Sequence, residues 1–353
     1  MPVAVLCVAA ALAACSDALE QDTTAGQVVG VAEGVTTPTV TLVSAADLTV
    51  SHTIPLRPLL GDGRVAGRGS VLIVVSYLIA VIDLALHTDT VTNEVHVDPE
   101  SVYGIAGAIQ SDSVAWASYE RSFPGIPTRY VVWRVNYRTN DTTSISFTAN
   151  PRAIALGGNA VFVVSVADDD ESWLTVLDTT LTKGSPRIKV LDSVPLTGLG
   201  ARGITLGLDG YLYVTSSTPI TGGRSTEGRL AIVDPVSRHE LAVINGLGDG
   251  LGPPVYHPSG RVLIPSVNGI LEVDAARRSV TLGPNKGIKP AGDAPSLLAV
   301  DQSGRVYAVV GHCSDPAATS GAVHVLSPPP EYELIKTIPI GVCPTGAAPA
   351  TIP

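Results

Sequence analysis

Hydrophobic and polar residues alternate along most of the chain in short segments that recur at a nearly constant spacing. The segments 151–156 and 201–206 align residue for residue, and each is followed by a turn pair and a second alternating segment. Alternation of this kind over about four to eight residues predicts a β-strand with one buried face. The turn pairs that join the first strand of a unit to the second are Gly158-Asn159, Asp209-Gly210, Ser259-Gly260 and Ser303-Gly304.

Each unit continues with a third strand that ends on a polar residue and then a fourth strand, such as 241–244 or 334–338. Units begin near residues 58, 103, 152, 201, 253, 295 and 344, which is a spacing of 42 to 52 residues. Four short strands in a unit of this length predict the blades of a β-propeller.

The first and last segments of the repeat region together make up one unit. Residues 26–57 contain the later strands of a blade without a first strand, whereas the segment 344–349 begins a unit and then stops. Six complete units and one shared unit predict an all-β fold, a seven-bladed propeller of four-stranded antiparallel blades that occupies residues 26–353 as a single domain. A shared blade pairs strand edges that would otherwise be exposed.

The first residues form a separate apolar segment. Residues 2–14 are almost wholly apolar, and they are too few for a membrane-spanning helix, which needs about 20 residues. An apolar run followed by small residues is typical of a secretory signal peptide. We therefore exclude residues 1–14 from the predicted fold.

Leu12-Ala13-Ala14-Cys15 resembles the bacterial lipobox, in which the cysteine thiol receives a diacylglycerol. The resemblance implies a lipoprotein signal peptide over residues 1–14, lipidation of Cys15 and a linker over residues 15–25. It places the protein in the bacterial cell envelope outside the cytoplasm. Ser16 after the cysteine favours the outer membrane. A plain secretory signal, in which Cys15 is incidental, is the alternative.

Two segments resemble a family of propeller repeats. Leu212–Ser216 is similar to the Tyr-Val-Thr-Asn strand of YVTN-type repeats, and Ile338–Gly346 looks like their junction between blades. The related NHL and gluconolactonase-like propellers have similar repeats. Propellers serve as scaffolds, binding proteins, lyases and hydrolases, so the resemblance implies the fold and leaves the function open.

The composition narrows the choice of partners. The chain carries 22 Lys and Arg against 32 Asp and Glu, a formal net charge of −10. Nucleic-acid binding requires a basic surface, so this balance argues against a nucleic-acid partner. Gly and Pro together number 62 of 353 residues, which is typical of many turns between short strands.

The loops between second and third strands differ in length. Two units take 14 residues from the turn glycine to the end of the third strand, and four others take 19 to 24. These insertions all leave the ring on one face, which in repeat proteins is often the binding face. The longer loops are predicted at 118–129, 167–172, 216–228 and 311–321.

Aromatic, cationic and imidazole side chains in these loops are the predicted contact residues, namely Tyr119, Arg121, Phe123, Arg129, Arg224 and His312. The run Asp168, Asp169, Asp170 and Glu171 is a candidate Ca²⁺ site, because hard cations bind carboxylate oxygens. A solvated acidic loop is the simpler interpretation of this run. The aspartates that end third strands are interpreted as turn-stabilising residues, namely Asp83, Asp178, Asp234 and Asp274.

The sequence holds no zinc-ligand spacing, no nucleophile elbow and no phosphate-binding glycine loop. We therefore predict no catalytic residue and no cofactor, with Ca²⁺ as the one candidate ion. The dense apolar run 71–83 is interpreted as two buried strands, because it is too short to span a membrane.

Cys313 and Cys343 are the pair that remains when Cys7 leaves with the signal and Cys15 is lipidated. Both follow strands that end on the same face of one blade, at a distance of about 10 Å for two strand spacings. Loop residues can shorten this to the roughly 5.5–6 Å that a disulfide requires. We predict a disulfide, which the compartment permits. Two unpaired thiols are the alternative.

The function predicted from these features is that of a binding or scaffold module, with a protein, glycan or small molecule as partner and membrane contact through the lipid alone. The alternative is a propeller enzyme, either a metal-dependent lactonase-type hydrolase or a streptogramin-type lyase. A structural surface-layer component is a third reading. Acidic, amide or imidazole side chains gathered at the channel mouth favour the enzyme, and a channel lined by Gly, Ala and Val favours the binding module.

Overall fold

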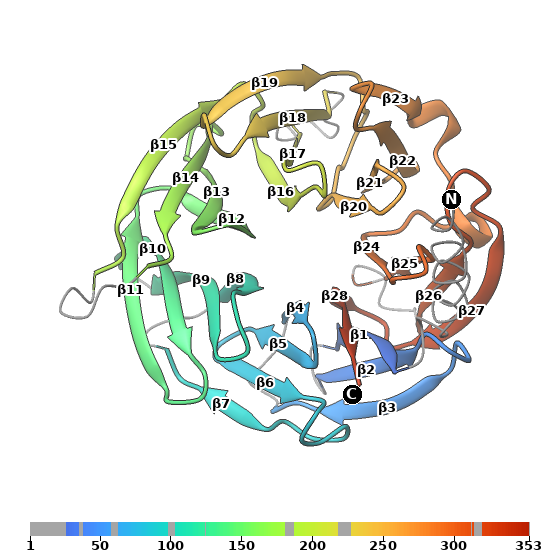
Figure 1. Cartoon of the computed structure of the whole chain (residues 1–353), viewed down its shortest axis with the longest axis horizontal. Helices are drawn as coiled ribbons and strands as arrows, with labels where there is room; N and C mark the ends of the chain where they lie inside the picture. The colour runs from blue at the N-terminus through green and yellow to red at the C-terminus, as the bar shows by residue number, and fades with distance from the viewer. Residues whose placement is uncertain are drawn as a thin grey trace, which may run out of the picture.

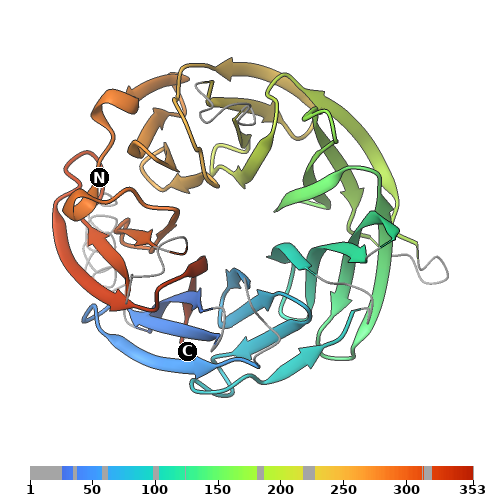
Figure 2. The ribbon, with the colours of Figure 1, turned by 180° about the vertical axis from the view of Figure 1, so that it is seen from behind.

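Seven four-stranded antiparallel sheets are arranged in a ring around one axis (Figures 1 and 2). The computed structural model describes residues 26–34, 38–57, 63–97, 103–123, 125–180, 187–217, 227–311, 313 and 320–352. We number the sheets as blades 1 to 7 in chain order, and the first strand of each blade lies nearest the axis. The predicted seven-bladed propeller is confirmed.

The strands of the first four blades follow the predicted units. Blade 1 consists of β28 (Pro344–Thr351), β1 (Gln27–Glu33), β2 (Thr39–Ser44) and β3 (Val50–Pro55). Blade 2 consists of β4 (Arg64–Arg68), β5 (Val71–Val75), β6 (Ile79–Asp83) and β7 (Asn93–Val95). Blade 3 consists of β8 (Tyr103–Ile109), β9 (Val114–Phe123), β10 (Ile126–Asn136) and β11 (Asp141–Phe147). Blade 4 consists of β12 (Asn150–Gly157), β13 (Ala160–Val166), β14 (Ser172–Asp178) and β15 (Val190–Leu196).

The remaining three blades have the same order. Blade 5 consists of β16 (Ala201–Leu206), β17 (Leu212–Ser216), β18 (Arg229–Asp234) and β19 (His239–Ile244). Blade 6 consists of β20 (Val255–His257), β21 (Arg261–Ser266), β22 (Gly269–Asp274) and β23 (Ser279–Leu282). Blade 7 consists of β24 (Leu297–Val300), β25 (Val306–Val310), β26 (Gly321–Leu326) and β27 (Leu334–Ile340). Two 3₁₀ turns, Pro284–Lys286 and Pro290–Gly292, connect blades 6 and 7.

The core is a ring of apolar layers, each packed between two adjacent blades. One layer joins blades 1 and 2 through residues such as Leu42 and Leu72, and another joins blades 7 and 1 through Val31 and Tyr307. The middle strands contribute to a layer on each face, so β5 and β6 are buried throughout. This explains the dense apolar run 71–83. Within the described residues, no helix has the length and apolar character needed to cross a membrane.

Four of the third strands end on aspartates that stabilise the next turn. The carboxylates of Asp83, Asp178, Asp234 and Asp274 accept backbone N–H groups of Ala85, Thr180, Val236 and Arg277 at 3.1, 2.8, 2.8 and 2.9 Å. Hydroxyl donors and then backbone amides lower the pKa of Asp178 and Asp234. For Asp274 the Arg277 amide is the main cause of the lowered pKa. The structural interpretation of these aspartates is confirmed.

Blade 1 closes the ring with strands from both ends of the described chain. β1 pairs with β28 from Gln27↔Thr351 to Glu33↔Pro344, and with β2 on its other side. The buried Glu33 carboxylate accepts the Thr41 hydroxyl and the Gly341 backbone N–H. The predicted shared blade is therefore present.

The predicted disulfide also lies at this closure. Cys313 and Cys343 are bonded, with their Cα atoms 4.6 Å apart. Cys343 directly precedes β28, and its carbonyl accepts the Gly34 N–H of blade 1 at 3.1 Å. The bond thus ties the loop after β25 to the segment that enters the closing strand.

Candidate functional site: the axial channel and the loop face

The inner strands surround a channel along the axis of the ring. Two cavities of about 410 and 500 Å³ share Val255, Leu298 and Ala347 in their walls, so they are the two ends of one channel. We call the end where the inner strands begin the loop-face mouth, because the long loops between second and third strands leave on that side. The other end is the turn-face mouth.

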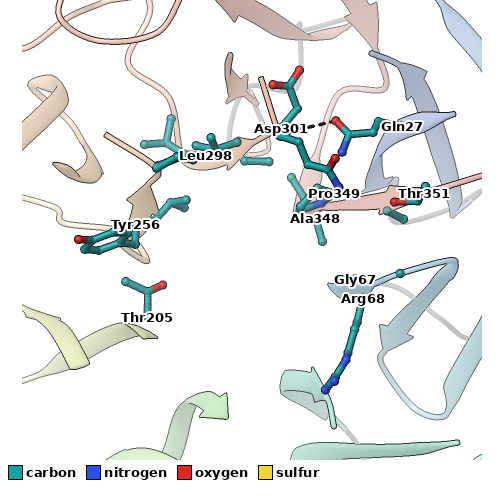
Figure 3. Close-up of a pocket in the computed structure, with 18 of the residues that line it drawn as sticks. Gln27, Gly67, Arg68, Thr205, Tyr256, Leu298, Asp301, Ala348, Pro349 and Thr351 are labelled. Carbon is teal, nitrogen blue, oxygen red and sulfur yellow. Dashed lines mark hydrogen bonds between the residues drawn. The ribbon is translucent and has the colours of Figure 1, made fainter. Parts of the chain in front are cut away.

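Two polar residues of the turn-face mouth, Asp301 and Gln27, are hydrogen-bonded within the fold (Figure 3). The buried Asp301 carboxylate accepts Arg305 Nε at 2.8 Å, the Tyr307 hydroxyl at 3.0 Å and the Ser303 hydroxyl at 2.6 Å. Gln27 Oε1 accepts the backbone N–H of Gln302 at 3.1 Å. These contacts give Asp301 and Gln27 a role in packing and in closure of the ring.

The loop-face mouth has mostly small and apolar walls. Glycine, alanine and valine residues from five of the inner strands line it, namely Val65, Ala106, Gly107, Ala153, Val255, Gly346 and Ala347. Its only charged lining residues, among those described, are Arg64, Arg152 and Arg202, and no carboxylate lines it. The arginines come from blades 2, 4 and 5.

β-Bulges at equivalent positions turn side chains into this mouth. In β12 the pairing skips from Pro151 to Ala153, and in β16 it skips from Ala201 to Gly203, which leaves Arg152 and Arg202 outside the ladders. The same irregularity in β8 and β28 leaves Ile105 and Thr345 at the mouth. Bulges commonly redirect side chains at the rims of closed β-structures.

The charges at this mouth act on one another. Partial burial lowers the pKa of Arg202, and the positive charge of Arg152 lowers it further, while Asp170 opposes both effects. Arg202 Nε donates to the Ser217 hydroxyl at 3.3 Å. Arg64 Nη1 donates to the Thr345 carbonyl at 2.7 Å. The mouth therefore gathers positive charge on a protein whose net charge is negative.

The predicted loop 118–129 is a β-hairpin. β9 continues to Phe123 and β10 begins at Ile126, with Arg121 paired to Arg129 and Tyr119 paired to Val131. The prediction of a loop was wrong because it rested on the number of residues between the second and third strands, and lengthening both strands accommodates the same number of residues. Arg129 is exposed. Burial and then the charge of Arg129 lower the pKa of Arg121.

Tyr119 is fully buried and does not contribute to a contact surface, so the prediction for this residue was wrong. Its ring packs in the layer between blades 2 and 3, and burial raises the pKa of its hydroxyl. Ala115, Ala117 and Tyr119 alternate along β9 and face the same layer. This period of two in the sequence could have shown that Tyr119 points inward.

Replacing Tyr119 with Phe tests this assignment. The buried hydroxyl has no hydrogen-bond partner among the described residues, so Tyr119→Phe removes an uncompensated polar atom. We expect the free energy of unfolding, measured in urea, to stay the same or rise by about 1 kcal/mol. Tyr119→Ala, which leaves a cavity, should cost roughly 3–5 kcal/mol. A Phe variant destabilised by more than about 1 kcal/mol would show that the hydroxyl is bonded.

The acidic run lies in the loop between β13 and β14. Asp168, Asp169 and Glu171 are exposed, and Asp169 accepts the Glu171 backbone N–H at 3.3 Å. Asp170 has a positive φ of 69° and its backbone carbonyl accepts the Gly200 N–H. In the described part of the chain, no three His, Cys, Asp or Glu side chains are grouped as metal ligands. The run is thus arranged as a solvated loop.

Several predicted residues lie outside what the structure describes. These are Cys15, Arg224, His312 and the side chain of Phe123. The predicted signal peptide and linker, residues 1–25, are outside it as well.

The chain is similar in fold to solved propeller structures. No family model matches the chain, and no curated protein matches it in sequence. Among solved structures it is similar to a chain of the mitotic checkpoint complex, with 12% identity over 81% of this chain and 79% of that one and a TM-score of 0.58. It is also similar to the dihydro-heme d1 dehydrogenase NirN in complex with DHE, with 14% identity, coverage of 93% and 76%, and a TM-score of 0.56. The WD40 domain of Toxoplasma gondii coronin matches at 12% identity, with coverage of 80% and 76% and a TM-score of 0.53.

Proposed function

We propose that the protein is a lipid-anchored binding module of the bacterial cell envelope, which holds its ligand on the loop face of the propeller. The observation that carries the proposal is the wall of the axial channel. Its loop-face mouth is lined mainly by small and aliphatic residues together with three arginines, and the Asp301 carboxylate at its other mouth is engaged by Arg305, Tyr307 and Ser303. Such a channel offers a shaped surface for a ligand rather than paired acid and base groups.

Ligand-dependent stabilisation tests this function. We would screen the full chain by thermal unfolding against small molecules, oligosaccharides and peptides. A ligand at about 100 times its Kd should add roughly 2.7 kcal/mol to the free energy of unfolding. The stabilisation should disappear when residues 217–228 are replaced by a two-residue turn like Val267-Asn268 of blade 6. It should persist in Val236→Ser, which changes an exposed side chain in a turn on the opposite face.

Two results would overturn this proposal. One is a ligand whose effect survives the loop replacement and is lost in Val236→Ser, because the binding face would then be the other one. The second is stoichiometric Ca²⁺ or another divalent metal in the purified protein, which would favour the hydrolase alternative.

The lipid anchor is tested separately through Cys15. We expect labelled fatty acid to be incorporated into the wild-type chain, which should partition into detergent. Cys15→Ala should abolish both, because the thiol is the acylated group, whereas Cys7→Ala should retain them. Unchanged detergent partitioning of Cys15→Ala would show that no lipid is attached at this residue.

A further inference from the structure

Positive charge is concentrated at one point of an acidic protein. Of the residues that line the loop-face mouth, the charged ones are Arg64, Arg152 and Arg202. All three are exposed at the rim, and they project from three different blades. The chain as a whole has ten more acidic than basic residues, yet the described lining of this mouth holds three arginines and no carboxylate.

The backbone places two of these arginines at the mouth in the same way. Arg152 and Arg202 occupy the same position of two successive blades, and a bulge frees each of them from its strand ladder. The two guanidinium groups are close enough for the charge of one to lower the pKa of the other. Like charges at this distance are unfavourable unless a counter-charge lies between them. Asp170 opposes the effect of Arg152 on Arg202.

We propose that the loop-face mouth binds a small organic oxyanion, a carboxylate or phosphate group carried on an apolar body. This inference rests on the proposed binding function and names its ligand class. Arginine presents five N–H donors in a planar fork that matches two oxygens of a carboxylate or phosphate. Arg152 makes no hydrogen bond or ion pair with the residues that the structure describes, so its donors are available to such a ligand.

The apolar residues that line the same cavity define the rest of the ligand. Ile105, Ile154, Ile204, Leu251 and Leu298 line the same cavity of about 410 Å³. A pocket of this size suits a ligand of one or two rings, since small-molecule sites measure about 300–1,000 Å³. Burying an apolar body there gains roughly 25 cal/mol for each Å² removed from water. The oxyanion fixes the orientation, because only the rim carries charge.

Three naphthalene derivatives test the inference because they share the body and differ in the head group. We would measure binding of 1-naphthyl phosphate, 1-naphthoate and neutral 1-naphthol to the full chain by isothermal titration calorimetry. The two anions should bind with a stoichiometry of one and should weaken as NaCl rises from 50 to 500 mM. The difference between phosphate and carboxylate shows which oxyanion the site prefers. Naphthol should bind at least about tenfold more weakly, since it lacks the charged hydrogen bonds.

Matched variants identify the residues. Arg152→Gln and Arg202→Gln should each weaken binding of the anions by about ten- to a hundredfold, and should leave naphthol unchanged. Arg277→Gln makes the same change of charge on the opposite face, where this arginine is 77% exposed, and should leave all three affinities unchanged. The thermal melts of these exposed-site variants should match the wild type, which separates loss of binding from loss of fold.

The outcomes separate this inference from the proposed function. Equal affinity for naphthol and the anions, or no binding of either anion, would overturn the oxyanion site. An equal loss in Arg277→Gln would also overturn it, because the effect would then be one of net charge. If a ligand from the thermal screen requires the 217–228 loop but not Arg152 and Arg202, the binding function stands and the oxyanion inference fails. If the anions require the arginines while Cys15→Ala partitions into detergent as the wild type does, the inference stands without the anchor.

Discussion

Removal of residues 344–353 is expected to abolish cooperative folding of the protein. β28 supplies the inner strand of blade 1, and without it β1 has an unpaired edge along seven residues that are all buried in the intact ring. Ala348 and Ala350 also leave the apolar layer between blades 1 and 2. An exposed, regular strand edge is a template for aggregation. We expect the loss to exceed about 5 kcal/mol, a large fraction of the roughly 5–15 kcal/mol that stabilises most proteins.

The experiment follows thermal unfolding by circular dichroism and assembly by size-exclusion chromatography. A circular permutant provides the control, because the end of β28 lies beside the start of β1: Gln27 pairs with Thr351. Placing residues 344–352 ahead of Gly26 through a short turn should restore a cooperative melt. A truncated chain that melts within about 1 kcal/mol of the wild type would show that blade 1 is stable without β28.

The fold was predictable because each blade is encoded locally. The turn glycines Gly158, Gly210, Gly260 and Gly304 all have positive φ, as the tight turns between first and second strands require. The aspartates at the ends of third strands bond to the adjacent turn, within a few residues of chain. Such signals can be read from any single unit, and repetition makes each of them stronger.

The hairpin of blade 3 was not predictable from length alone. The distance along the chain from the second to the third strand is the same whether the extra residues form a loop or lengthen both strands. Tyr119 illustrates the consequence, because the residue lies inside the lengthened strand and faces the core. The inward alternation of Ala115, Ala117 and Tyr119 was the better guide.

The grouping of arginines at the loop-face mouth could be recognised only from the three-dimensional structure of the ring. Arg152 and Arg202 occupy the same place in the aligned segments 151–156 and 201–206, yet they are 50 residues apart in the sequence. Nothing in one unit shows that this position leaves the ladder at a bulge and faces the axis. Arg64 joins them from a third blade only because the ring closes. Sites assembled from repeats in this way leave no local motif.

Replacing both Cys313 and Cys343 with alanine is expected to lower the free energy of unfolding by roughly 3–4 kcal/mol, since the bond closes a loop with a sequence separation of 30. For a chain of this size, that loss corresponds to a fall in Tm of about 5 °C. The bond anchors the segment that enters β28, and the ring would begin to open there. The effect should be seen in chemical unfolding without reductant, because reductant removes the same cross-link from the wild type.

The control separates the effect of the cross-link on stability from the effect of replacing the two cysteine side chains. Wild type in reductant should match the double variant, and reductant should leave the double variant unchanged. With Cys7 and Cys15 replaced by alanine, the unfolded and unreduced chain should show no reactive thiol, whereas two thiols would contradict the bond. Loss of the disulfide should also affect the channel. Thr345 lies two residues after Cys343, and its carbonyl accepts Arg64 Nη1 at 2.7 Å. Opening the disulfide should therefore weaken naphthyl phosphate binding by a small factor. The folded state should stay cooperative, since the bond joins blade 7 to the segment that enters blade 1 and the other five blades do not contain it.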